Sequence, residues 1–199
     1  MKRPSEGKLF VVSGPSGGGK TTVVNALLKR LPSVYRSVSV TTRPRRPSER
    51  DGAHYRFVSA EQFQRLRRQG ALVEWARVHR AHYGTPRAPV LRALARGRDV
   101  VLSIDIQGAR KIRRQFGERA ALVFIVPPSF DHLRQRLLKR RTETPEAVQD
   151  RLQTASREVA CSKWYDYVIV NYRRTTAVEQ FKAIVIAERL RVARGVLMV

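Results

Sequence analysis

The sequence contains a single cysteine, Cys161, and no long hydrophobic run. One cysteine excludes an internal disulfide and a cysteine cluster for zinc, and the few histidines lack the paired spacing of a metal site. The longest apolar stretch runs from about Ala120 to Val126, which is far too short to cross a membrane. The first residues also lack the apolar segment of a signal peptide. We therefore expect a cytoplasmic protein without a membrane partner.

Acidic side chains are scarce as well, with 16 Asp and Glu against 40 Lys and Arg and a formal net charge of +24. A charge of this size attracts polyanions, so nucleic acid has to be considered as a partner. The arginines, however, are spread over nearly every segment and form no basic tail. A general arginine bias in the coding sequence accounts for this spread better than a dedicated binding surface, and we do not expect a nucleic-acid partner.

The most specific motif present is a glycine-rich loop between an apolar run and a helix-forming segment. The stretch GPSGGGKT, which starts at Gly14, fits the phosphate-binding pattern G-x-x-x-x-G-K-[ST]. Glycines let the backbone wrap around an anion, and the following helix presents its unpaired N–H groups. Lys20 is expected to reach the β- and γ-phosphates of ATP, and the Thr21 hydroxyl to ligate Mg²⁺. The predicted ATP-binding residues here are Gly14, Pro15, Ser16, Gly17, Gly18, Gly19, Lys20, Thr21 and Thr22.

Apolar runs typical of buried strands alternate with helix-forming segments along most of the chain. Strands are predicted at 9–12, 99–105, 121–126 and 165–170, and helices at 22–31, 107–116, 129–141, from 145 onward and at 176–194. This alternation favours an α/β fold, a P-loop NTPase-type parallel sheet flanked by helices. The segment 35–42 alternates like one further strand. Ser59 opens a helix with a capping-box pattern, and Thr176 is expected to cap the last helix.

Antiparallel-looking pieces between about Ser39 and Pro86 predict an insertion that carries a second ligand site. Arg43 and Arg46 lie in a proline-stiffened loop, and Tyr55 and Tyr83 supply hydroxyls from strand ends. Guanidinium groups bind phosphate in a bidentate way, and phenols add a neutral donor. The alternative interpretation is a solvated basic loop.

Glu74 is an acidic residue inside an apolar strand segment. A buried carboxylate needs donors, because burying it unpaired is costly. One of the many arginines could supply them. So could a guanine base, whose N1–H and 2-amino group are adjacent donors, whereas adenine has an acceptor at that position. Asp105 ends its strand at the carboxyl edge of the sheet, where it could reach either the guanine or the water shell of Mg²⁺.

Taken together, these motifs resemble the guanylate kinase family over nearly the whole chain. The resemblance rests on their order and spacing: GPSGGGKT from Gly14, SVSVTTRPRR from Ser37, DG and HY at 51–55, VEWA from Val73, YGT from Tyr83, IDIQGA from Ile104, PPS from Pro127 and RRTET from Arg140.

The resemblance implies a three-part organisation. Residues 1–38, 87–128 and 165–199 would form the nucleotide-binding core, residues 39–86 a GMP-binding α+β insertion and residues 129–164 the helical lid region. The implied reaction converts ATP and GMP into ADP and GDP with Mg²⁺, and dGMP is a further expected acceptor.

Roles of individual residues follow from the same resemblance. Guanine would be contacted by Ser39, Glu74, Thr85 and Asp105, and the GMP phosphate by Arg43, Arg46, Tyr55 and Tyr83. The ATP phosphates would be reached by the lid residues Arg136, Arg140 and Arg151, and Asn171 would lie near the adenine. The expected catalytic set is Lys20, Arg43, Arg136, Arg140 and Arg151. Arg45 and the basic helix 110–114 are interpreted as solvated faces.

Three other functions remain open at this point. A P-loop kinase acting on a phosphorylated sugar would lack the TTR and YGT pieces. A catalytically inactive, guanylate-kinase-like binding module would typically have a damaged P-loop. A nucleic-acid-binding P-loop ATPase would bind DNA or RNA in a salt-sensitive way and hydrolyse ATP faster in its presence.

Overall fold

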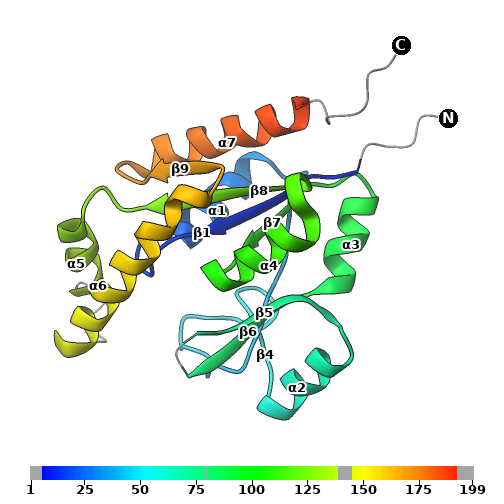
Figure 1. Cartoon of the computed structure of the whole chain (residues 1–199), viewed down its shortest axis with the longest axis horizontal. Helices are drawn as coiled ribbons and strands as arrows, with labels where there is room; N and C mark the ends of the chain where they lie inside the picture. Colours follow the sequence, from blue (N-terminus) through cyan, green and yellow to red (C-terminus); the bar gives the residue numbers. More distant parts are fainter. Residues whose placement is uncertain (1–5, 79, 139–144, 192–199) are drawn as a thin grey trace.

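The computed structural model describes residues 6–78, 80–138 and 145–191. At its centre lies a five-stranded, fully parallel sheet (Figure 1). Its strands, in spatial order, are β2 (Tyr35–Arg36), β7 (Val100–Ser103), β1 (Leu9–Ser13), β8 (Ala120–Val126) and β9 (Tyr167–Val170). Every residue of the middle strand β1 is buried, as expected for a parallel strand that helices cover on both faces.

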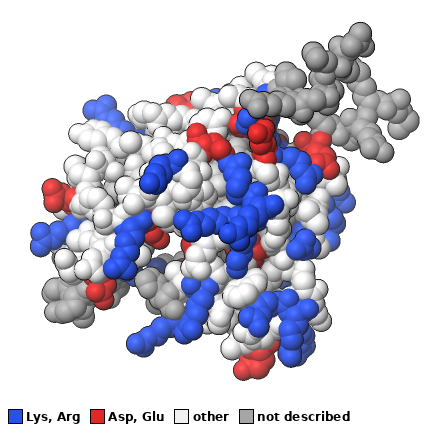
Figure 2. Space-filling model, in the orientation of Figure 1, with Lys and Arg blue, Asp and Glu red and all other residues white. Residues whose placement is uncertain are grey.

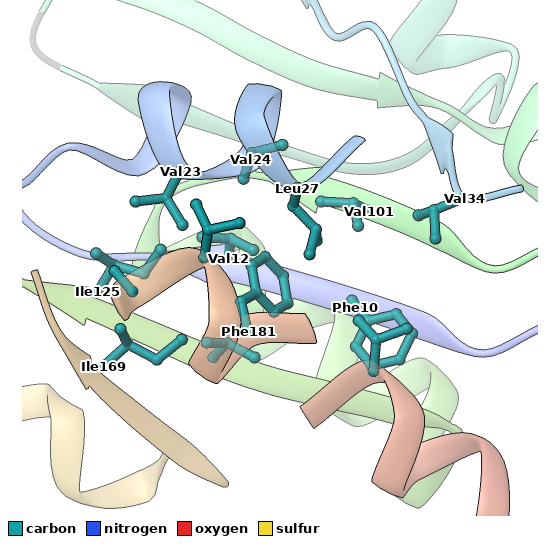
Figure 3. Packing of buried hydrophobic residues seen from close by; sticks show 14 of the residues in the cluster. Phe10, Val12, Val23, Val24, Leu27, Val34, Val101, Ile125, Ile169 and Phe181 are labelled. Carbon is teal, nitrogen blue, oxygen red and sulfur yellow. The ribbon is translucent and has the colours of Figure 1, made fainter. Parts of the chain in front are cut away.

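Helices cover the two faces of this sheet. On one face pack α1 (Lys20–Arg30) and α7 (Arg174–Leu190), and on the other α3 (Arg87–Ala95) and α4 (Ile106–Phe116). Figure 3 shows the first of these layers, in which Phe181 of α7 and Phe10 of β1 meet edge to face with ring centroids 6.4 Å apart. The buried residues of α1, Val23, Val24 and Leu27, repeat at helical spacing and so face the sheet together. The α/β fold expected from the sequence is confirmed.

A second, smaller sheet comes from the segment between Val40 and Pro86. Its order is β4 (Arg56–Phe57), β3 (Val40–Thr41), β6 (Ala81–Pro86) and β5 (Leu72–Val78). Helix α2 (Ala60–Arg68) covers it by burying Phe63. The capping box predicted at Ser59 is present, because its hydroxyl accepts the Gln62 N–H at 3.2 Å while the Gln62 side chain accepts the Ser59 N–H at 3.0 Å.

The strand predicted at 35–42 is wrong as a single element. Its first part, β2, pairs with β7 in the large sheet, and its last part, β3, pairs with β6 in the small one. Alternating polarity reports an extended, half-buried chain but not which neighbour it pairs with. Strand β6 was not expected, because Gly84 and Pro86 weaken a strand pattern.

The cap predicted at Thr176 is also wrong. Helix α7 begins at Arg174 with Arg173 as its N-cap, and the Ala177 N–H already donates to the Arg173 carbonyl at 3.0 Å. Thr176 lies inside the first turn, because the chain leaves β9 in only a few residues and must start the helix early to cover the sheet. The other predicted helices and strands are present, with bounds shifted by a few residues.

Two further helices, α5 (Phe130–Leu138) and α6 (Pro145–Ala160), pack against one another beside the large sheet (Figure 1). Their contact is apolar and includes Leu133, Leu137 and Ala155. Short 3₁₀ turns, η1 (Gly117–Arg119) and η2 (Cys161–Trp164), precede β8 and β9. The end predicted for the helix that corresponds to α5, near Arg141, lies outside the described residues. None of the helices in the described part of the chain has the length and apolar character needed to span a bilayer.

The excess of positive charge is distributed over the surface. Figure 2 shows lysine and arginine side chains over many parts of the visible face, with acidic side chains between them. This matches the even spread of arginine along the sequence.

Candidate active site

The glycine-rich loop connects the carboxyl end of β1 to the start of α1 and packs closely against the neighbouring strand β8. A Cβ atom added to Gly14 would lie 2.0 Å from the Ile125 carbonyl oxygen, so no side chain fits there. Gly19, the N-cap of α1, has φ of 95° in the left-handed region, which favours glycine. The loop therefore turns sharply at the N-terminus of a helix, the arrangement that binds phosphate.

The ammonium group of Lys20 lies across this loop. Its Nζ donates to the carbonyl oxygens of Gly14 at 2.5 Å and Pro15 at 2.9 Å. These contacts hold a positive charge at the first residue of α1, where the helix dipole also favours an anion. An incoming phosphate would meet both.

Two residues predicted to contact ATP support the loop through the carbonyl of Gly18. The buried side chain of Asn171 donates to that oxygen at 2.9 Å, and Arg136 of α5 approaches it at 3.5 Å while also donating to the Asn171 carbonyl at 3.3 Å. The fit is tight, since a Cβ on Gly19 would lie 2.1 Å from the Asn171 amide nitrogen. Direct contact of Asn171 or Arg136 with ATP stays a prediction.

Helix α6 brings three further side chains to the loop, Arg151, Thr154 and Glu158. Arg151 donates to the Ser16 hydroxyl at 3.4 Å, so the predicted lid arginine lies over the loop. Burial raises the pKa of Glu158, and the positive charge of Lys20 opposes that rise. Arg140, the remaining predicted lid arginine, lies outside the described residues.

A single cavity of 390 Å³ joins the glycine-rich loop to the second sheet. This volume is within the range of small-ligand sites. Among the residues predicted to bind ATP and Mg²⁺, those that line the cavity are Gly14, Ser16, Gly17, Gly19, Lys20, Thr21, Thr22 and Arg151. Among those predicted to bind GMP, the lining residues are Ser39, Arg43, Arg46, Tyr55, Glu74, Tyr83 and Asp105. The structure thus brings the two predicted ligand sites face to face.

Arg43 lies in the part of the cavity formed by the insertion and is held by Glu49. Its Nη2 donates to both carboxylate oxygens of Glu49, at 2.7 and 2.9 Å, and the backbone N–H of Arg46 donates to the same carboxylate at 2.9 Å. Partial burial disfavours the guanidinium charge of Arg43, but hydrogen bonds with Glu49 and Tyr83 outweigh it and raise the pKa of Arg43. Glu49 therefore fixes Arg43 within the loop, whereas the side chains of Arg45, Arg46 and Arg50 are exposed.

The two predicted tyrosines pack beside this arginine. The rings of Tyr55 and Tyr83 lie 5.8 Å apart, and the Arg43 guanidinium lies 5.6 Å from the Tyr55 ring centroid. Burial raises the pKa of Tyr55, so its phenol keeps the proton that it could donate to a phosphate.

The buried carboxylate of Glu74 lines the same cavity. Only 4% of Glu74 is exposed, and its Oε1 accepts a hydrogen bond from the Thr85 hydroxyl at 2.5 Å. Burial, together with the nearby charge of Asp105, raises the pKa of Glu74 to about 7, although the hydrogen bond from Thr85 opposes the rise. Thr85 is fully buried behind Glu74, so in this structure it acts on the carboxylate.

Asp105 is both the N-cap of α4 and part of the cavity wall. Its Oδ1 accepts the Gly108 N–H at 2.9 Å, and burial raises the pKa of its carboxyl group. Gly108 leaves room for the two acids, because a Cβ there would lie 2.5 Å from Glu74 Oε2 and 3.2 Å from Asp105 Oδ1.

Sequence reasoning missed several residues in or beside this site, of which four bear on its chemistry. Glu49, three positions after Arg46 in the charged loop, could have been found as the acid nearest the two arginines. Ser37 has a buried hydroxyl with no hydrogen-bond partner among the described residues, and it lines the cavity. Nothing in the neighbouring sequence marks Glu158 or Lys111, because each reaches the site only when distant segments of the chain fold together. The interpretation of Lys111 as part of a solvated face is wrong, since its Nζ bonds to the Trp75 carbonyl at 2.5 Å.

Comparisons with known proteins agree with this geometry. The family model for guanylate kinase matches residues 6–188. The chain belongs to the guanylate kinase family. Guanylate kinase of Desulfitobacterium hafniense (strain Y51) is 48% identical over 190 residues, covering 96% of this chain and 94% of that protein. The guanylate kinase of Carboxydothermus hydrogenoformans is 46% identical, with coverage of 95% and 92%.

A solved structure of guanylate kinase from Anaplasma phagocytophilum is similar in fold. Its TM-score is 0.79 at 35% sequence identity, over 94% of this chain and 89% of that one. Membership in the guanylate kinase family and the expected fold class are thereby confirmed, and the similarity extends over the insertion and α6 as well as the core.

Proposed function

We propose that the protein transfers the γ-phosphoryl group of ATP to GMP, giving ADP and GDP, and that dGMP is also an acceptor. The observation that carries this proposal is that one cavity is lined by Lys20 of the glycine-rich loop and by Arg43 and Glu74 of the insertion. A cavity of this kind suits two nucleotides that meet at their phosphates.

Base selection is assigned to the insertion. The carboxylate of Glu74, oriented by Thr85, offers acceptors to the N1–H and 2-amino donors of guanine. Asp105 and Ser39 line the same cavity and are proposed as further guanine contacts. Adenine would leave Glu74 facing an acceptor, and an unpaired buried carboxylate is strongly unfavourable.

Phosphate binding on the acceptor side is assigned to Arg43, Arg46, Tyr55 and Tyr83. Their guanidinium groups and phenols would hold the GMP phosphate in line with the γ-phosphorus of ATP. No general base is needed, since a phosphate monoester is largely ionised near pH 7.

On the donor side, the loop N–H groups and Lys20 would bind the β- and γ-phosphates of ATP. Arg151 of α6, which already lies at Ser16, and Arg136 would offset the charge shared by the transferring oxygens. Closure of the lid helices over the cavity would exclude water and so limit hydrolysis of ATP.

The residues present fit a Mg²⁺ ion bound with ATP. Thr21 lines the cavity directly after Lys20 and is exposed, so its hydroxyl is available as a hard oxygen ligand. Magnesium keeps several waters and needs only one or two protein oxygens beside the substrate phosphates. When bound, the ion would neutralise charge on the phosphate oxygens.

An acceptor screen tests this proposal. ADP release from ATP and Mg²⁺ is measured with GMP, dGMP, IMP, AMP, CMP and UMP, and separately with RNA. We expect ADP only when an acceptor is present, fastest with GMP and slow with AMP. ADP release that is independent of GMP, or that RNA stimulates, would contradict the proposal.

A further inference from the structure

Lys111 of α4 reaches across to strand β5 of the small sheet. Its Nζ donates to the backbone carbonyl of Trp75 at 2.5 Å and lies 4.2 Å from the centroid of the Trp75 ring. An ammonium with a strong acceptor and an aromatic face as neighbours has a defined position. The two residues are 36 positions apart in sequence, so the contact joins α4 to the insertion.

The residue that precedes Trp75 is Glu74. Helix α4 approaches the Glu74 carboxylate at Gly108, one helical turn before Lys111. A Cβ added to Gly108 would lie 2.5 Å from Glu74 Oε2. Residues three apart on a helix lie on the same face. The ammonium of Lys111 and the N-terminus of α4 therefore both face the region of the buried carboxylate.

We propose that Lys111 is a positioning residue for guanine recognition, which acts on Glu74 through an ammonium group anchored on the next residue, Trp75. The inference rests on the proposed function, in that Glu74 is taken as the guanine reader. It adds a residue that acts on Glu74 and not on the substrate.

The charges that face Glu74 are opposed. Burial and the acidic Asp105 raise its pKa, whereas Lys111 and the hydrogen bond from Thr85 lower it, with a net value of about 7. A protonated Glu74 would point an O–H at one of the two guanine donors and lose an acceptor. Lys111 therefore adds to the effects that keep part of the protein able to bind guanine at neutral pH.

The test removes the charge of Lys111 while keeping a hydrogen-bond donor at this position. Lys111→Gln has a side-chain N–H donor but no charge, and Lys111→Arg has both. Arg114→Gln is the matched control, because Arg114 is exposed on the same helix. Dissociation constants for GMP are measured by calorimetry between pH 6 and 9, together with KM for ATP and a thermal melt of each variant.

We expect Lys111→Gln to bind GMP about fivefold more weakly at pH 7, as for an increase of about one unit in the pKa of Glu74, and to approach the unmodified protein at pH 9. Lys111→Arg and Arg114→Gln should keep the original pH profile, and KM for ATP should not change. An equal loss at every pH, or no loss, would overturn the inference. If Lys111→Gln fails to fold, Lys111→Met takes its place, and a pH profile of GMP binding displaced to higher pH supports the inference in the same way. If the unmodified protein does not bind GMP at all, the proposed function fails and not the role of Lys111 alone.

Discussion

Both carboxylate oxygens of Glu49 accept hydrogen bonds from a single nitrogen of Arg43, at 2.7 and 2.9 Å. The pair is mostly shielded from solvent, with 13% of the Glu49 side chain and 19% of the Arg43 side chain exposed. The other terminal nitrogen of Arg43 donates to the Pro44 carbonyl at 2.7 Å. The guanidinium proposed to bind the GMP phosphate is therefore fixed before any ligand arrives.

This relationship predicts the effect of Glu49→Ala. Without the carboxylate, Arg43 regains side-chain freedom and the Arg46 N–H loses its acceptor, so the ordering of the loop would have to occur on binding. We expect KM for GMP to rise about tenfold, equivalent to roughly 1.4 kcal/mol, with KM for ATP unchanged. Steady-state kinetics with each substrate varied in turn measures this. A fall in KM for GMP would show that Glu49 competes with the phosphate instead of orienting its ligand.

Lys20→Ala should separate catalysis from folding. The Lys20 ammonium bonds to two loop carbonyls at a half-buried position, and bonds made by a charged group contribute roughly 1.5 to 3 kcal/mol each to stability. Loss of a preorganised charge at the transferring phosphate, by contrast, lowers turnover by a factor on the order of 10² to 10³. Coupled ADP release beside a thermal melt measures both. The assignment of Lys20 fails if turnover stays near normal in a folded variant, and Arg114→Ala serves as the control for loss of a positive charge.

The raised pKa of Glu74 predicts opposite effects of pH on stability and on binding. The folded protein holds a proton on Glu74 up to about pH 7, whereas the unfolded chain releases it near 4.5, so the folded state binds more protons between these values. Stability contributed by protonation is present below about pH 4.5 and is lost as pH rises through 7, whereas GMP binding should tighten over the same rise.

Glu74→Gln tests this balance directly. The variant cannot ionise, so its unliganded form should keep its stability between pH 5 and pH 8. The unmodified protein should lose up to about 3 kcal/mol over the same range. It should also lose most of its affinity for GMP. Thermal melts at the two pH values, with and without GMP, give both quantities. Equal pH dependence in the two proteins would mean that Glu74 is already ionised in the fold.

A pair of substitutions at Asn171 examines the support of the glycine-rich loop. Asn171→Ala removes the donor to the buried Gly18 carbonyl, which we expect to cost about 1 to 3 kcal/mol and to raise KM for ATP several-fold. Asn171→Asp, of the same shape, places an acceptor against that carbonyl and should be worse in both respects. Chemical denaturation and ATP titrations distinguish them. If Asn171→Asp leaves the stability of the protein unchanged and only KM for ATP rises, Asn171 contacts the nucleotide directly.

The local parts of this protein were predictable from the sequence. Residues 14–22 are contiguous, and their spacing alone fixes a loop between a strand and a helix. Ser59 and Gln62 cap their helix within one turn, and buried runs such as 121–126 report their own burial. Arg43, Tyr55 and Glu74 were candidates from their residue types and surroundings, and the resemblance over the whole chain assigned them to one ligand. The structure places these residues in one cavity, and their individual contacts with substrates remain proposals.

Tertiary structure decided what depends on residues far apart in the chain. The sequence gives no sign that segment 35–42 divides between two sheets, because the partner strands β7 and β6 come much later. Nor could the sequence indicate that Asn171 donates to the Gly18 carbonyl or that Lys111 donates to the Trp75 carbonyl. Periodicity and motif spacing describe short-range order along the backbone. The charge state of Glu74, in contrast, depends on burial and on groups from β6 and α4 that meet only when the chain has folded.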